Sequence, residues 1–167
     1  MALRLSQEEF TRGVQTYSRD MYRAARALTP CDADAQDAVG QAVLLAWQSL
    51  DRLRDPEALR AWLVKITVNC ARQQCRHRGR VLYLSELEPL AGGREDPRPH
   101  ELWDAVLSLP PEQRTAVVLF YYEDLSLREI ARTLRVPEGT VKSRLSRGRE
   151  RLRTLLSEEA SEKEDTT

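Results

Sequence analysis

Apolar residues recur along this chain every three or four positions, and no stretch alternates apolar and polar residues as a strand would. That spacing gathers apolar side chains on one face of an α-helix, because a helix turns once every 3.6 residues. The first such pattern starts at Ser6 and Glu9, a pair with capping-box spacing, and stops at Pro30. We therefore predict an all-α protein.

Two more helices are predicted before residue 79. The second begins near Asp34, and the third follows a break at Asp55-Pro56 and runs to about Arg78. The stripe expected to be buried on the second helix is Val39, Val43, Ala46, Trp47, Leu50 and Leu53. The stripe expected on the third is Leu59, Trp62, Leu63, Ile66 and Cys70. We interpret Trp47 and Trp62 as core residues rather than stacking platforms for bases.

The helical pattern disappears over residues 79–100, which contain prolines and a Gly-Gly pair. Such a long stretch without periodicity is unusual inside one domain, so we predict a flexible linker. It joins two small helical domains, residues 1–78 and 101–156, the second built from four short helices. Residues 157–167 are acidic and lack apolar anchors, so we expect a disordered tail.

Several classes of protein are excluded by what the chain does not contain. No apolar run approaches the roughly 18 residues of a membrane-spanning helix, and the first residues do not form a signal peptide, so we expect a cytoplasmic protein without membrane insertion. Cys31, Cys70 and Cys75 do not match zinc-ligand spacing or a disulfide framework, and we expect no metal and no cofactor. No set of side chains forms a catalytic constellation, so we expect no enzyme.

Charge is strongly segregated although the net charge is zero. Residues 1–80 carry 13 basic and 9 acidic side chains, and residues 125–157 carry 9 and 3. Residues 81–124 carry 3 basic and 9 acidic side chains. Two basic modules separated by acid favour contact with a polyanion, although solvated helix faces also collect arginine.

A helix-turn-helix is predicted from Leu125 onward. Ser126 and Glu129 can cap the first helix, and V-P-E-G from Val136 interrupts it. In the next helix, short serines and flanking cations lie opposite the apolar stripe, as major-groove recognition requires. These residues are Lys142, Ser143, Ser146 and Arg147. The alternative, a solvated bundle helix, explains less, because residues 142–153 hold six cations and one carboxylate.

The predicted third helix carries a second basic surface. Lys65, Asn69, Arg72 and Arg76 recur at helical spacing beside its apolar face. Cations at this spacing can hold a phosphate backbone, and an amide can read the edge of an unstacked base. An exposed Asn69 without such a role is the simpler alternative.

Four segments together resemble one family. They are D-A-D-A-Q-D-A-V-G-Q from Asp32, L-R-A-W-L-V-K-I-T-V-N-C from Leu59, L-P-P-E-Q-R-T-A-V-V-L-F-Y-Y from Leu109, and V-P-E-G-T-V-K-S-R-L-S-R-G-R from Val136. The chain is similar to bacterial RNA polymerase sigma factors of the extracytoplasmic-function group. That resemblance implies a factor that binds core RNA polymerase, directs it to particular promoters and promotes DNA melting.

The resemblance also implies residue roles. The surface that grips the beta-prime clamp helices would include Asp34, Asp37, Gln41 and Gln48. The part that melts and reads the minus-10 element would be Asp55, Pro56, Glu57, Ala58, Lys65, Asn69, Arg72 and Arg76. Minus-35 contacts would come from Lys142, Ser143, Ser146 and Arg147, with phosphate contacts from Arg144 and Arg149.

The implied partners are promoter DNA and core RNA polymerase, including its beta subunit, and an anti-sigma factor remains open. The second helix departs from the family pattern D-A-E-D-L-V-Q-E-x-F, notably at Gly40. Arg135 stands where the turn commonly has glycine, and Gly148 where alanine is usual. Two alternatives therefore stay open: a stand-alone helix-turn-helix regulator, and a polymerase-binding antagonist that has lost promoter reading.

Overall fold

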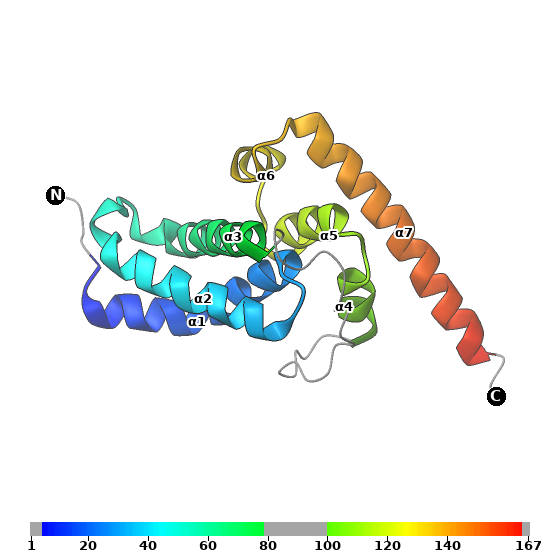
Figure 1. The fold of residues 1–167 in the computed structure, drawn as a ribbon, viewed down its shortest axis with the longest axis horizontal. Coiled ribbons are helices and arrows are strands. Elements are labelled where there is room, and N and C mark those ends of the chain that lie inside the picture. The colour runs from blue at the N-terminus through cyan, green and yellow to red at the C-terminus, as the bar shows by residue number, and fades with distance from the viewer. Residues whose placement is uncertain (1–4, 79–99, 165–167) are drawn as a thin grey trace. The chain divides into compact units, whose positions relative to one another are not determined.

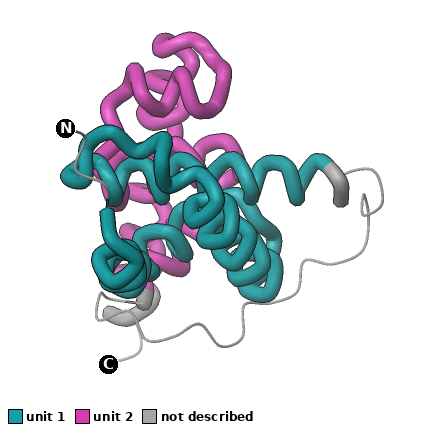
Figure 2. Tube along the Cα trace, turned by 90° about the vertical axis from the view of Figure 1, so that its left-hand side faces the viewer, with its two compact units in different colours: residues 1–91 teal, residues 92–167 magenta. Residues whose placement is uncertain are grey.

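The computed structural model describes residues 5–78 and 100–164, and every regular element in those ranges is a helix (Figure 1). The all-α prediction is confirmed. The chain divides into two compact units, residues 1–91 and 92–167 (Figure 2). The linker expected at residues 79–100 lies outside the described residues except for His100, which begins a helix.

The first unit is a bundle of three helices. They are α1 (Gln7–Leu28), α2 (Asp32–Gln48) and α3 (Leu59–Arg78), with short 3₁₀ turns η1 (Leu50–Arg52) and η2 (Pro56–Ala58) between α2 and α3. Each of the three helices packs against the other two. This arrangement lets both α2 and α3 keep one face outside the bundle.

The start of α1 is fixed by the capping box that the sequence predicted. The Ser6 hydroxyl oxygen accepts from the backbone N–H of Glu9 at 3.2 Å, and the Glu9 carboxylate accepts from the N–H of Ser6 at 2.7 Å. These two bonds satisfy donors that a helix N-terminus leaves unpaired. They also hold the pKa of Glu9 below its ordinary value, because the bonds to Ser6 favour the charged carboxylate.

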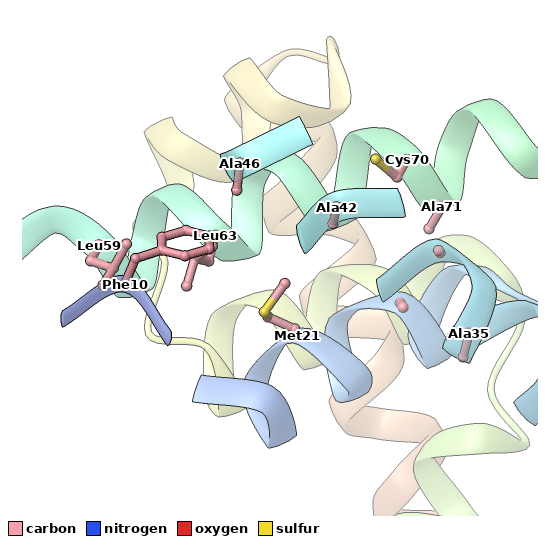
Figure 3. Close-up of a cluster of buried hydrophobic side chains, with 11 residues drawn as sticks. Phe10, Met21, Ala35, Ala42, Ala46, Leu59, Leu63, Cys70 and Ala71 are labelled. Atoms are coloured by element: carbon pink, nitrogen blue, oxygen red, sulfur yellow. The ribbon is translucent and has the colours of Figure 1, made fainter. Parts of the chain in front are cut away.

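The buried side of α2 agrees with the prediction in part. Its fully buried residues are Ala35, Ala38, Ala42 and Ala46. Figure 3 shows Ala42 and Ala46 close to the larger side chains of α1 and α3. Of the predicted stripe, Ala46 is fully buried, and Val39, Val43, Leu50 and Leu53 are half-buried and pack against the core, whereas Trp47 is 44% exposed and was wrongly placed. Alanine allows α2 to approach two helices at once, which bulkier residues would prevent.

An ionic cluster ties α1 to α3. The Arg60 guanidinium lies 3.1 Å from the Asp20 carboxylate, which also accepts a hydrogen bond from the buried Arg23. Near the other end of the bundle the Cys75 thiol donates to the Leu28 carbonyl at 2.8 Å. The Arg60–Asp20 and Cys75–Leu28 contacts connect residues 40 and 47 positions apart and hold α3 against α1.

The second unit contains, over residues 100–164, four α-helices and one π-helical turn. They are α4 (His100–Leu107), α5 (Pro111–Val117), the π-helical turn η3 (Val118–Tyr122), α6 (Leu127–Leu134) and α7 (Glu138–Glu164). Helix α7 packs against α4, α5 and α6. The core includes Leu119, Ile130 and Val141, all fully buried.

Helix α7 is longer than predicted. The tail expected to be disordered from residue 157 is helical to Glu164 in the structure. The Ser157 hydroxyl donates to the Arg153 carbonyl at 2.7 Å, and the Ser161 hydroxyl to the Ser157 carbonyl at 3.0 Å. The physical reason is that extending an existing helix through Glu, Ala and Lys needs no new nucleus, so these residues continue it without apolar anchors.

Candidate nucleic-acid interface

Helices α6 and α7 are joined by a tight turn over residues 135–137. Ser126 and Glu129 form the predicted capping box at the start of α6. Arg135 ends α6 in the left-handed conformation, with φ 57°, and the N–H of Val136 then donates to the Ala131 carbonyl at 3.0 Å. The turn therefore depends on a conformation that glycine adopts more easily than arginine does.

One face of α7 is open to solvent over its first three turns. Lys142, Ser143, Ser146 and Arg147 are all exposed, and Val141, Leu145 and Gly148 are buried on the opposite side. The side chains of Lys142 and Arg147 make no hydrogen bond or ion pair with other residues in the described ranges. The short serines leave room beside the helix backbone, and the long cations extend past them. The structure therefore brings the four sequence-predicted base-reading residues together on one accessible face.

The two predicted phosphate-binding arginines have protein partners. Arg144 lies 3.6 Å from the carboxylate of Glu112 on α5, and the guanidinium of Arg149 donates to the hydroxyl of Tyr121 at 3.1 Å. Tyr121 is 46% exposed and comes from η3. Sequence reasoning missed Tyr121, because it lies 28 positions before Arg149 and no local pattern connects the two residues.

The stripe predicted on α3 lies on one side of the helix. Asn69 and Arg76 are exposed, whereas Lys65 and Arg72 are half-buried. The opposite side of α3 contributes Leu63 and Val64 to the fully buried residues of the bundle. The half-buried cations can lay their alkyl stems along the protein. Trp62, expected in the core, is half-buried at the edge of the cluster.

The side chain of Asp55 fixes the conformation of the loop before α3. Asp55 caps η2 by accepting a hydrogen bond from the N–H of Glu57 at 3.0 Å, and Pro56 occupies the first helical position. Glu57 and Ala58 are exposed, and Pro56 is half-buried. The Asp55 carboxylate therefore shapes the turn. The Glu57 side chain makes no such hydrogen bond to the loop backbone within the described residues.

On α2 the structure separates one predicted residue from the others. Asp37, Gln41 and Gln48 are exposed, but Asp34 is only 1% exposed and lies in the bundle. The correction follows from the alanine face: Asp34 is next to Ala35, at the buried N-terminal end of that face. Asp34 is therefore removed from the candidate surface.

The exposed side of α2 also carries large apolar residues. Leu44 is 58% exposed, Leu45 48% and Trp47 44%. Leu44, Trp47 and Gly40 line a shallow hollow with Phe10 of α1, whose ring lies 5.4 Å from that of Trp47. Sequence reasoning placed Trp47 in the core, because the period that puts it beside Val43 does not tell which side of α2 is covered. Exposed apolar groups beside polar ones are typical of protein-binding surfaces.

No group of three or more potential metal-ligating side chains occurs within residues 5–78 and 100–164. All three cysteines are unpaired by disulfides, and burial raises the pKa of the Cys70 thiol, as its position on the apolar face of α3 predicts. No helix in the described part of the chain is long and apolar enough to cross a membrane.

Two protein-family models match the chain. The model "Sigma-70 region 2" matches residues 14–81, and the model "Sigma-70, region 4" matches residues 100–152. Together the matches span both compact units. They contain α2 and α3 in the first unit, and the turn between α6 and α7 in the second.

Curated relatives extend the match over most of the chain. The ECF RNA polymerase sigma factor SigE of Mycolicibacterium smegmatis is 36% identical over 162 residues, covering 89% of this chain and 62% of that protein. The chain therefore spans less than two thirds of that relative. RNA polymerase sigma factor SigV of Bacillus subtilis is 31% identical, with 87% of this chain and 90% of SigV covered.

Solved structures with a similar fold include two chains bound to a second protein. The sigma factor RpoE, in complex with the anti-sigma factor NepR from Bartonella quintana, matches with a TM-score of 0.71 and 26% identity, covering 90% of this chain and 98% of that one. CnrH, in complex with the cytosolic domain of CnrY, matches with a TM-score of 0.60 and 26% identity, covering 91% and 90%.

Proposed function

The chain belongs to the extracytoplasmic-function sigma factors of bacterial RNA polymerase, and from that premise we propose how its three exposed surfaces divide the work of transcription initiation. Helix α2 binds core polymerase, α3 with the preceding loop opens and reads the minus-10 element, and α7 reads the minus-35 element. The domains serving these roles are residues 1–78 and 101–156.

The observation that carries the proposal is the exposed face of α7. Lys142 and Arg147 flank Ser143 and Ser146, and neither cation is engaged within the described residues. A helix with short central side chains and long cations at its edges fits the major groove of intact duplex DNA. A bidentate contact from arginine to guanine is worth about 1 to 3 kcal/mol of discrimination.

The surface of α3 suits a different state of DNA. Its cations are spaced along the helix, before and after Asn69. The exposed amide of Asn69 has donors and an acceptor that can bind the edge of a base. A row of cations beside a polar reader fits a single strand, whose bases are unstacked and accessible. We assign strand separation and minus-10 reading to Lys65, Asn69, Arg72 and Arg76, with Asp55–Ala58 as the adjoining loop.

Helix α2 offers the polymerase surface. Asp37, Gln41 and Gln48 supply polar contacts, and Leu44 and Trp47 supply apolar area beside them. An interface of this kind combines an apolar centre with a polar rim. The occupant proposed here is the pair of beta-prime clamp helices, with further contacts to the beta subunit elsewhere.

We also propose the cellular setting and the partners of the chain. The chain acts in the cytoplasm, on promoter DNA and polymerase, without catalysing a reaction itself and without a cofactor. Two solved relatives were determined with a second protein, in one case an anti-sigma factor. We propose that an anti-sigma factor also binds this chain.

Run-off transcription with purified core polymerase on a promoter library tests the function directly. Initiation that depends on this chain supports a sigma factor. Promoter binding by the chain alone, with transcription only repressed, would instead favour the stand-alone regulator. Polymerase binding without any initiation would favour the antagonist.

The division between the two DNA surfaces needs a separate experiment. Holoenzyme binding and permanganate-detected melting are measured on a duplex promoter and on the same promoter with a pre-melted bubble. Arg147→Ala should weaken recruitment on both templates by about 1 to 3 kcal/mol. Asn69→Ala should reduce melting of the duplex and leave its initial binding nearly intact.

Matched controls come from α1, outside both surfaces. Gln15→Ala removes an exposed amide and Arg12→Ala an exposed arginine. Neither should change binding or melting. Equal losses for Asn69→Ala and Arg147→Ala on both templates would contradict the division, leaving α3 with general phosphate affinity only.

A further inference from the structure

Tyr121 is an exposed tyrosine beside the DNA-facing helix that none of the assignments above includes. Its hydroxyl oxygen accepts a hydrogen bond from the Arg149 guanidinium at 3.1 Å. A phenol has one hydrogen to donate as well as an oxygen that accepts. Within the described residues that hydrogen has no acceptor, so the pair presents an O–H and N–H donors at the surface without a counter-charge.

The path of α5 and η3 beneath α7 explains how the pair forms. Helices α5 and α7 approach so closely at Gly148 that a Cβ added there would lie 2.8 Å from the Val117 side chain. The chain then makes a π-helical turn, in which the N–H of Glu123 reaches back five residues to the Val118 carbonyl at 3.1 Å. This wider turn carries Tyr121 to the edge of α7, where its ring packs edge-on against Phe120 with centroids 4.9 Å apart.

At the other edge of α7 the partner of the arginine is a negatively charged carboxylate rather than a neutral phenol. There Arg144 is paired with a carboxylate, that of Glu112, at the start of α5. At about 100° per residue, Arg144 and Arg149 lie on opposite sides of Ser143. A phosphate must compete with Glu112 for Arg144, whereas at Arg149 the neutral phenol adds a donor. The edge with Tyr121 is therefore the one already arranged for an anion.

Donation from arginine to the phenol oxygen has two consequences. It restricts the guanidinium to one region of space, so less side-chain freedom is lost when an anion binds. It also polarises the O–H bond and makes the phenol a better donor to a third group. The donors fit a DNA phosphate, whose oxygens are acceptors only.

We propose that Tyr121 and Arg149 form a phosphate clamp at one edge of the recognition helix, in which Tyr121 positions the guanidinium and donates its own hydroxyl to the same phosphate. The proposal rests on duplex binding by α7 and adds a residue and a role to it. Because a phosphate contact carries no sequence information, the clamp contributes affinity and register rather than base preference.

The test is a double-mutant cycle on duplex promoter binding by the holoenzyme. Tyr121→Phe removes the hydroxyl and keeps the ring, and we expect it to weaken binding about five- to tenfold. In an Arg149→Ala background the same change should cost about twofold or less, since the group it positions is gone. In an Arg151→Ala background, which removes another exposed arginine of α7, the full loss should remain.

Two further measurements distinguish a clamp from a structural role. Arg149→Ala should lower the slope of log K against log salt by about 0.9, the value for one phosphate contact on duplex DNA. Tyr121→Phe should weaken binding to promoter and scrambled duplex by the same factor and leave the thermal unfolding midpoint unchanged. Arg147→Ala should instead weaken promoter binding more than scrambled binding.

The outcomes also separate this proposal from the proposed function. An equal loss for Tyr121→Phe with and without Arg149, no loss at all, or a loss that follows a lowered unfolding midpoint would overturn the clamp. If Arg147→Ala reduces promoter binding in the same series, reading by α7 still holds. If the parent holoenzyme shows no preference for promoter over scrambled duplex, the proposed function itself is contradicted, whatever the result for the clamp.

Discussion

Gly40 and Gly148 occupy helix interiors, yet their surroundings are opposite. A Cβ added at Gly40 would meet nothing within 4 Å, whereas one at Gly148 would meet Val117 at 2.8 Å. Val117 is β-branched and buried, so it has little freedom to move aside. The first glycine therefore costs helix stability without a packing reason, and the second permits a helix crossing.

The two Gly→Ala substitutions should consequently shift stability in opposite directions. Gly40→Ala should raise the free energy of unfolding by up to about 1 kcal/mol, the difference in helix propensity. Gly148→Ala gains the same amount but overpacks the crossing at a cost of about 1 to 3 kcal/mol, so a net loss is expected. Urea unfolding of both variants checks the pair, and stabilisation by Gly148→Ala would contradict the close approach of α5.

Arg135 gives a second prediction at the residue scale. It has φ 57° and is exposed, so its side chain adds strain to the turn without contributing to the core. Arg135→Gly should raise the free energy of unfolding by about 1 kcal/mol, because glycine adopts the left-handed region freely. Arg132→Gly, in the regular part of α6, should lower it by about the same amount. Chemical denaturation of the two variants measures both changes.

At the scale of single elements, the N-terminal cap of α1 makes stability depend on pH. The pKa of Glu9 is lowered from its ordinary 4.5 by its hydrogen bonds with Ser6. A carboxylate with a lowered pKa in the folded state adds stability above the unfolded pKa, and that stability is lost as pH falls through the folded pKa. The cap therefore works fully at neutral pH and weakens in acid.

Glu9→Gln tests this dependence. The parent should be more stable than the variant at pH 7, and the difference should disappear as the pH is lowered through the folded pKa of Glu9. Thermal unfolding between pH 3 and pH 7, with Glu8→Gln as the uncapped neighbour, measures the effect. A difference that stays constant across this range would show that the charge of Glu9 is irrelevant to the cap.

Helix α2 gives the prediction for polymerase binding. Asp37 lies on its exposed side, away from the alanine face that holds the bundle together. Asp37→Arg should weaken association with core polymerase about tenfold or more, because a reversed charge at an interface repels the group it formerly attracted. Asp51→Arg, in the exposed turn η1, is the matched control. Unchanged affinity of Asp37→Arg would remove α2 from the interface.

At the scale of the whole molecule, each unit has a core of its own. Leu63 is fully buried in the three-helix unit, and Trp103 packs edge-on against Tyr122 in the other, with ring centroids 5.3 Å apart. Separate cores predict separate unfolding. This property follows because the helices of each unit pack on one another.

Leu63→Ala should therefore destabilise one unit by about 2 to 5 kcal/mol and leave the other unchanged. Denaturation is followed by helical circular dichroism and, in a background whose single tryptophan is Trp103, by fluorescence. The part of the dichroism change that belongs to the three-helix unit should move to lower denaturant concentration, while the Trp103 midpoint stays constant. A parallel shift of both signals would mean that the units unfold together.

The helices and caps of this fold depend on local sequence, whereas the burial of helix faces depends on long-range packing. Local patterns were sufficient for the helices, both capping boxes, and the grouping of Lys142, Ser143, Ser146 and Arg147 on one face, because each depends on residues within a few positions. The extent of α7 was underestimated, since apolar anchoring was taken as a condition for helix that an already formed helix does not need.

Tertiary structure alone decided the rest. Helical period shows which residues share a face of α2, but that helix has apolar residues on two sides, and only packing selects the alanine side and buries Asp34 with it. The pairing of Tyr121 with Arg149 depends on where α5 crosses α7. Sequence therefore determined which side chains lie together along each helix, and packing determined which are covered and which distant residues meet, because close contact between helices depends on the fit of whole surfaces.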